Sequence, residues 1–384
     1  MSCRLGRQKR CARSYRSGSL PAAHPAQSCP LPLAGRFASG APRPKRPPSK
    51  RLAAPLRASF MTEAAKKTRS AKGLSKPPDF QSAVLALACR KSSRQDQGMR
   101  IRIVHDTVYT YQQPARGLIQ ILRLTPRDHD GQHVREWRIE PSVNGRLTAR
   151  EDGFGNLVHW FTADDPTDAL TVRVTGEIET FETSGVVRGA VERLPDLFYL
   201  RDTPLTEASA ELKAFAEKVA GKGERDALPM LHRLLAAVHD AVTFEPGPTS
   251  ASTSAAQAFE VGKGVCQDLT HIFLAAARHL EIPSRYVSGY FRRDDGADDQ
   301  KAGHAWAESL VPGLGWIGFD PANGISATEA HVRVAVGLDY LGAAPIRGSR
   351  VGGGTETLDV ALRVEQVHSQ SQSQGHGQQS QSQS

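Results

Sequence analysis

Cysteine is scarce in most of the chain. The sequence of 384 residues has five cysteines, and four of them lie before residue 99: Cys3, Cys11, Cys29 and Cys89. Only Cys266 lies in the remainder, so no disulfide can form within residues 99–384. A single cysteine accompanied elsewhere by His and Asp is a candidate nucleophile in a reducing compartment; the alternative is a buried small hydrophobic residue.

Long apolar runs are missing as well. No stretch approaches the roughly 18 apolar residues that a membrane-spanning helix needs, so we expect no membrane span and a cytoplasmic location. A net positive charge is also missing from most of the chain, because residues 1–98 carry 21 Lys and Arg against 3 Asp and Glu, whereas the net charge of the other 286 residues is −9. A nucleic-acid partner is therefore not expected for the folded part.

The two ends of the chain have compositions that do not support a packed core. Residues 1–98 are rich in Arg, Ser and Pro and are predicted to be a disordered basic leader. The leader superficially resembles an organellar transit peptide; the alternative, which we favour, is that Met99 begins the natural protein, because an alternating strand pattern starts there. Residues 368–384 form a low-complexity tail of Ser, Gln, Gly and His.

The segment 99–185 is predicted to be a small antiparallel β domain. From Met99 the run RIRIVHDTVYTY alternates apolar and polar residues, as a half-buried strand does. Turn-forming Asp, Gly, Asn and Pro clusters separate further expected strands. These strands are expected at residues 117–124, 134–140, 157–162 and 170–180.

The segment 186–345 has a different pattern, which predicts helices followed by an antiparallel sheet. Helices are expected at 207–220, 226–242 and 265–280, the last apolar enough to be central and buried. Strands are expected at SRYVSGYF, HAWAESLV and GWIGFD. A last alternating run within 355–367 is expected to return to a sheet. The order of elements indicates an α+β fold.

Three residues in these elements form a candidate catalytic set. Cys266 lies in the first turn of the expected central helix, where free N–H groups and the helix dipole favour a thiolate. His304 begins one strand and Asp320 ends the next, so an antiparallel hairpin would make them neighbours. The spacing predicts a Cys-His-Asp triad with His304 as base and Asp320 as its orienting partner.

The ordered motifs GKGVCQDLTHIFLAAARHLEIPSRYVSGY, GHAWAESLV and GWIGFDPANG resemble the transglutaminase-like superfamily, which has a papain-like fold. The resemblance is strongest to bacterial members with an extra N-terminal β domain. It implies a central helix carrying the nucleophile Cys266, packed on an antiparallel sheet, with His304 as general base and Asp320 as orienting acid. It also implies a thioester enzyme acting on amide or peptide bonds of a protein or peptide, without a cofactor.

Hydrolysis by a protease or amidase is favoured over amine transfer, and a catalytically silent protein-binding module is the alternative. Well-studied transglutaminases place a Trp upstream of the cysteine to stabilise the oxyanion. Here no Trp occurs between Trp160 and Cys266, so an oxyanion donor other than backbone N–H groups is not assigned.

Several neighbours have both a structural and a functional interpretation. Gln267 and Asp268 are expected to form hydrogen bonds at the helix N-terminus. A metal site of Cys266, Asp268 and His271 is disfavoured, because their spacing does not place them on one helical face, and no metal is predicted. Tyr286 and Trp306 could line a substrate pocket, although packing in the core is the more common use of such residues.

Overall fold

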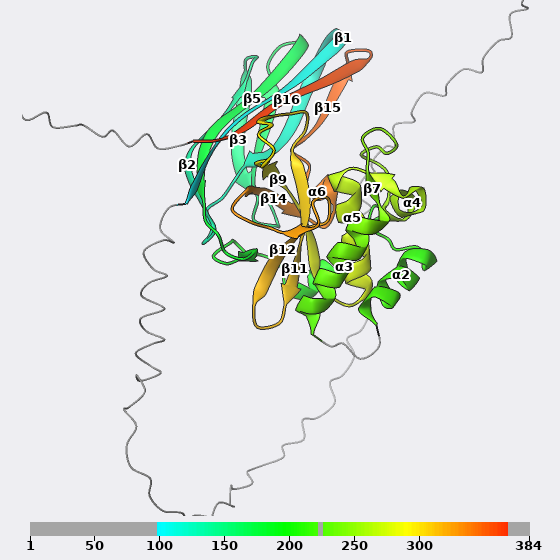
Figure 1. Ribbon diagram of the computed structural model, residues 1–384. Coiled ribbons are helices and arrows are strands. Elements are labelled where there is room, and N and C mark those ends of the chain that lie inside the picture. Colours follow the sequence, from blue (N-terminus) through cyan, green and yellow to red (C-terminus); the bar gives the residue numbers. More distant parts are fainter. Residues whose placement is uncertain (1–97, 222–225, 368–384) are drawn as a thin grey trace, which may run out of the picture. The chain divides into compact units, whose positions relative to one another are not determined.

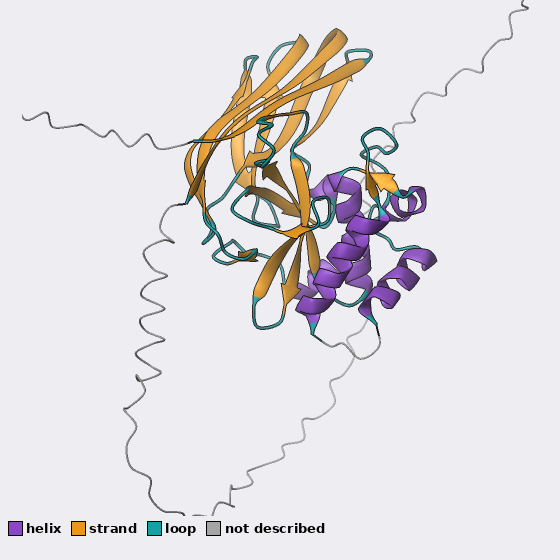
Figure 2. Ribbon diagram, viewed as in Figure 1, coloured by secondary structure: helices purple, strands orange, loops and turns teal. Residues whose placement is uncertain are grey.

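The computed structural model describes residues 98–221 and 226–367, coloured along the chain in Figure 1. Apart from Gly98, the predicted basic leader and the low-complexity tail lie outside these residues. Two antiparallel sheets and a group of helices make up the described part, as Figure 2 shows. The predicted α+β fold is confirmed. No described helix is both long enough and apolar enough to span a bilayer.

The larger sheet has eight strands among the described residues and contains most of the N-terminal segment. Its strands are β1 (Met99–Thr125), β2 (Gln132–Pro141), β3 (Gly145–Glu151), β4 (Leu157–Ala163), β5 (Thr167–Thr180), β10 (Asp299–Gln300), β15 (Ile346–Gly352) and β16 (Glu356–Gln366). The long strand β1 pairs with β4, β5, β15 and β16. Strands from both ends of the described chain are therefore hydrogen-bonded to β1.

The structure corrects one of the predicted strands. Residues 117–124 are not a separate strand, because β1 continues through Pro114 and Gly117 with shifts in register on either side of them. Such irregularities let a strand bend without ending. Pro114 is tolerated at such a shift because its nitrogen, which has no proton, is not required to donate to the neighbouring strand. The other three strands predicted in this segment are confirmed as β2, β4 and β5.

The smaller sheet has six strands among the described residues, in the order β13-β12-β11-β9-β14, with β6 beside β12. Their bounds are β6 (Val186–Val187), β9 (Ser284–Phe291), β11 (His304–Val311), β12 (Gly315–Asp320), β13 (Ile325–Ser326) and β14 (His331–Gly337). A two-stranded parallel pair, β7 (Thr243–Phe244) and β8 (Lys263–Gly264), lies outside both sheets. The predicted strands β9, β11 and β12 are confirmed, and β14 was not predicted.

Side-chain caps fix where the helices begin. The helical elements are η1 (Asp196–Leu200), α2 (Ala210–Ala220), α3 (Ala227–Ala241), α4 (Ala255–Val261), α5 (Cys266–His279) and α6 (Tyr340–Ala343). The Ser209 hydroxyl accepts from the Leu212 N–H, so α2 starts later than its apolar pattern suggested. Asp226 caps α3 and Ser254 caps α4. Helix α4 was not predicted, because small polar residues precede it.

The largest of three hydrophobic clusters among the described residues joins the two sheets and the helices. Helix α5 lies at its centre, with nearly every residue after its first turn buried. The same core contains Ile101 and Ile103 of β1 and Leu362 and Val364 of β16. Odd-numbered residues of β1 from 101 to 111 are buried, and Ile101 and Ile103 on this face share a cluster with the helices and the smaller sheet. This packing positions the sheet beside the candidate site.

Candidate active site

Cys266 is the first residue of α5 and follows the extended residue Val265. The Asp268 and Leu269 N–H groups both donate to the Val265 carbonyl, whereas the amides of Cys266 and Gln267 precede any helical acceptor. The thiol is free and half-buried. It lies where the helix dipole and unpaired N–H groups stabilise negative charge.

His304 and Asp320 lie together at one end of the hairpin formed by β11 and β12. The His304 Nε2 donates to the Asp320 Oδ2 over 2.7 Å. The register of β11 on β9 sets His304 opposite Gly289, where any side chain would collide with the Val332 carbonyl. The proximity predicted from the hairpin is therefore present in the structure.

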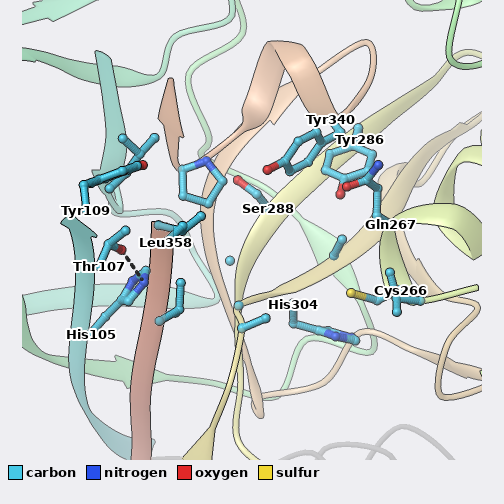
Figure 3. Close-up of a pocket in the computed structure, with 18 residues that line it drawn as sticks. His105, Thr107, Tyr109, Cys266, Gln267, Tyr286, Ser288, His304, Tyr340 and Leu358 are labelled. Carbon is cyan, nitrogen blue, oxygen red and sulfur yellow. Dashed lines mark hydrogen bonds between the residues drawn. The ribbon is translucent and has the colours of Figure 1, made fainter. Parts of the chain in front are cut away.

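The His304 imidazole favours the protonated form. Burial disfavours its charge, but the Asp320 carboxylate and a hydrogen bond with Cys266 outweigh burial and raise the pKa of His304 from 6.5 to about 10. Because Nε2 is bonded to Asp320, Nδ1 is the ring nitrogen left for the thiol. The imidazole is bonded to the carboxylate, and Figure 3 shows the Cys266 sulfur beside the His304 ring.

Asp320 is fully buried and accepts five hydrogen bonds. Its Oδ2 accepts from His304, from His331 Nε2 at 3.2 Å and from Asn323 Nδ2 at 2.6 Å. Its Oδ1 accepts from the backbone N–H groups of Ala322 and Asn323. Burial opposes the charge, yet these imidazoles hold the pKa of Asp320 well below its usual value. Asp320 is an ionised, rigidly held carboxylate.

A cavity of about 250 Å³ opens beside the Cys266 sulfur (Figure 3). On the side of the nucleophile it is lined by Gln267, Tyr286, His304 and Tyr340. On the opposite side it is lined by residues of β1, β15 and β16. A substrate carbonyl placed against the sulfur would occupy this cavity.

Two protein-family models match parts of the chain. Residues 101–179 match the bacterial transglutaminase-like N-terminal region, and residues 213–321 match the transglutaminase-like superfamily. An uncharacterised protein of Mycobacterium leprae is 31% identical over 283 residues, which cover 70% of this chain and 99% of that protein. The chain belongs to the transglutaminase-like superfamily.

More distant similarities agree with this membership. An uncharacterised protein of Mycobacterium tuberculosis is 28% identical over 279 residues, covering 65% of this chain and 87% of that protein. The crystal structure of a proposed cysteine protease from Cytophaga hutchinsonii superposes with a TM-score of 0.58 at 21% identity, covering 72% of this chain and 93% of the other. This structural match shows a shared fold. The transglutaminase-like superfamily includes cysteine-dependent enzymes.

The structure adds His331, which was not predicted from the sequence. This buried residue begins β14, and its Nδ1 accepts from the Thr328 N–H, so the proton lies on Nε2 and points to Asp320. Burial is the main reason why the pKa of His331 is lowered, which keeps the ring neutral. The alternation of HVRVAVG was a usable signal for the strand, but nothing local showed that its first residue reaches Asp320.

The predicted supporting residues divide into two groups. Asp268 accepts from the Val265 N–H at 2.8 Å and the Thr249 hydroxyl at 2.6 Å, as expected for a residue that holds the helix start. Gln267 and Tyr286 line the cavity. Trp306 does not: it is buried, and its ring stacks on His304 at a centroid distance of 6.1 Å. Trp306 therefore packs against the His304 ring and does not line the cavity.

One group of potential metal ligands occurs among the described residues: His304, Asp320 and His331. Their arrangement is that of a hydrogen-bonded network, because each histidine points an Nε2 at the same carboxylate oxygen. Asp268 and His271 do not join Cys266 as ligands, because the His271 Nε2 accepts from the Tyr340 N–H and Asp268 caps the helix. Proton transfer, rather than metal binding, fits these bonds.

Proposed function

We propose that this protein is a cysteine hydrolase that cleaves amide or peptide bonds through a thioester on Cys266. The observation that carries the proposal is the hydrogen bond of His304 to Asp320, with the His304 ring beside the Cys266 sulfur at a cavity that both residues line. The Cys266 thiolate attacks the carbonyl carbon while His304 holds the proton on Nδ1. That proton passes to the leaving amine as the C–N bond breaks, and the acyl group stays on sulfur.

Water completes the cycle. His304, now neutral, removes a proton from a water molecule, whose oxygen attacks the thioester carbon. The C–S bond breaks, a carboxylic acid leaves, and the proton returns to the thiolate and imidazole pair. Asp320 keeps its charge throughout, since its role is to hold the imidazole tautomer and stabilise the imidazolium.

Tyr286 supplies the missing oxyanion donor in this proposal. Its ring lines the cavity, and burial together with the negative charge of Cys266 raises the pKa of Tyr286 well above 10, so the phenol stays protonated. With the free N–H groups of the helix start, this hydroxyl would stabilise the negative oxygen that forms during attack. It takes the place of the upstream Trp that this chain lacks.

Hydrolysis is favoured over transfer to an amine for an electrostatic reason. None of the described residues that line the cavity is Asp or Glu, so no carboxylate there attracts a primary ammonium group. The proposed substrate is a protein or peptide, and the proposed location is the cytoplasm.

Mass spectrometry of a peptide library incubated in heavy-oxygen water would test the reaction. Hydrolysis places heavy oxygen in new carboxyl groups, whereas an added primary amine would appear in the products of a transferase. Cys266→Ala and His304→Ala should abolish both products with unchanged circular dichroism. Iodoacetamide alkylation of Cys266 that is indifferent to His304→Ala would overturn the proposal in favour of a silent binding module.

A further inference from the structure

The larger sheet provides one wall of the cavity. In β1, His105, Thr107 and Tyr109 all face it, as the two-residue period of a strand requires. On the neighbouring strand, Leu358 pairs with Tyr109 and Val360 pairs with Thr107, and both also line the cavity. Figure 3 shows this wall opposite Cys266 and His304.

The wall is uncharged. None of the described residues lining the cavity is Asp, Glu, Lys or Arg. Burial lowers the pKa of His105 to about 4, so this imidazole is neutral at physiological pH. Its two ring nitrogens are bonded to the Tyr290 and Thr107 hydroxyls, each at 3.1 Å. A charged side chain packed against this wall would lose hydration and find no partner of opposite charge on it, because Cys266 and His304 lie on the opposite side of the cavity.

The size of the cavity limits what it can hold. Its volume of about 250 Å³ lies just below the range of roughly 300–1,000 Å³ found for sites that bind drug-sized ligands. It therefore suits one amino-acid residue better than a long peptide segment. The side chain nearest to the attacked carbonyl belongs to the residue that carries that carbonyl, so this residue occupies the space next to the sulfur.

We infer that the cavity binds an uncharged apolar or aromatic residue on the acyl side of the scissile amide, and that β1 and β16 select it. The inference rests on the proposed function, because it assumes attack by Cys266. The larger sheet thereby determines substrate specificity, while the proposed catalytic residues come from helix α5 and the smaller sheet. Tyr109 and Leu358 provide an aromatic ring and a branched aliphatic side chain for contact with the bound residue.

Acetylated amino-acid chloromethyl ketones test this inference directly. Compounds carrying Phe, Leu, Asp or Lys side chains place a ketone where the substrate carbonyl would lie, and the sulfur displaces chloride from the adjacent chloromethyl carbon. Alkylation of Cys266 is followed by intact mass, and each rate is divided by the iodoacetamide rate of the same variant. We expect the Phe and Leu compounds to react at least about tenfold faster than the Asp and Lys compounds.

The variant Leu358→Lys adds a charge to the wall at a side chain that is 54% exposed and so tolerates the change. It should lower the relative rate of the Phe compound and raise that of the Asp compound. Thr357→Lys is the matched control, because Thr357 is the exposed neighbour in β16 and does not line the cavity. It should leave all ratios unchanged.

Two outcomes separate failure of the inference from failure of the proposed function. Equal relative rates for all four compounds, or ratios unchanged by Leu358→Lys, would overturn the inference even if alkylation depends on His304. Alkylation by iodoacetamide that does not depend on His304 would overturn the proposed function, and with it the inference.

Discussion

Replacing Asp320 by Asn should disable His304 although the two side chains have the same shape. Asp320 is the acceptor in all five of its hydrogen bonds, three at Oδ2 and two at Oδ1. The amide of Asn accepts only through its oxygen, so its NH₂ group must replace one of the two carboxylate oxygens. It then faces either the three side-chain donors, His304, His331 and Asn323, or the two backbone N–H groups. In the first orientation His304 Nε2 becomes an acceptor, and its proton moves to Nδ1.

The size of the expected loss of turnover follows from the ion pair between His304 and Asp320. Asp320 is the main stabilising influence that raises the pKa of His304 from 6.5 to about 10. At an effective dielectric constant of about 20, which also suits buried groups, unit charges about 4 Å apart attract each other by about 4 kcal/mol, which corresponds to roughly three orders of magnitude in an equilibrium constant. We therefore expect turnover to fall by about a thousandfold, with a much smaller change in substrate binding.

The assay is the rate of Cys266 alkylation by iodoacetamide from pH 5 to 10, combined with kcat and KM on the fastest library peptide. Asp294→Asn is the control, since Asp294 is an exposed residue whose loss changes net charge equally. A variant Asp320→Asn that keeps the alkylation profile and kcat of the wild type would refute the triad. So would a loss confined to KM.

The same pair predicts how stability depends on pH. The pKa of His304 is higher in the folded state than its unfolded value of 6.5, so the pair's contribution is fully present below pH 6.5 and is lost as pH rises through about 10. The difference in unfolding free energy between the wild type and Asp320→Asn, from urea titrations, should shrink over this interval. Tyr286→Phe should lower kcat by about a hundredfold with little change in KM, if its hydroxyl stabilises the oxyanion; an unchanged kcat would remove Tyr286 from the mechanism. His331→Ala removes one donor to a charged group, so turnover should fall by about tenfold, and His331→Gln should restore part of it; identical rates for both variants would contradict a hydrogen-bonding role. Glu308 is buried against Arg285 and Arg333, so Glu308→Ala should lower the free energy of unfolding by about 3–5 kcal/mol in urea titrations, and a loss near zero would show that the ion network is dispensable.

The candidate triad could be predicted because its positions depend on local patterns. Cys266 begins an apolar helix, and a short turn places His304 and Asp320 at the same end of a hairpin. Strands β9 and β11 have apolar residues bounded by turns, which is why their limits agree closely with the structure.

The features that the sequence did not predict depend mainly on contacts between distant parts of the chain. The wall residue Tyr109 meets Leu358 only because β1 pairs with β16, and no local pattern specifies that register. The polar sequences of β3 and β15 give no strand signal. His331 is the same case, since its role depends on where β14 pairs with β9.

The pairing of β1 with β16 has a consequence for the timing of synthesis. A ribosome delivers residues 99–125 early and residues 356–366 some 240 residues later, and until then one edge of β1 has no partner. The catalytic residues can come together before the wall that faces them is finished. If the proposed function holds, the newly made chain would carry its nucleophile before its specificity pocket is complete, and the pairing of β16 with β1 would complete that pocket.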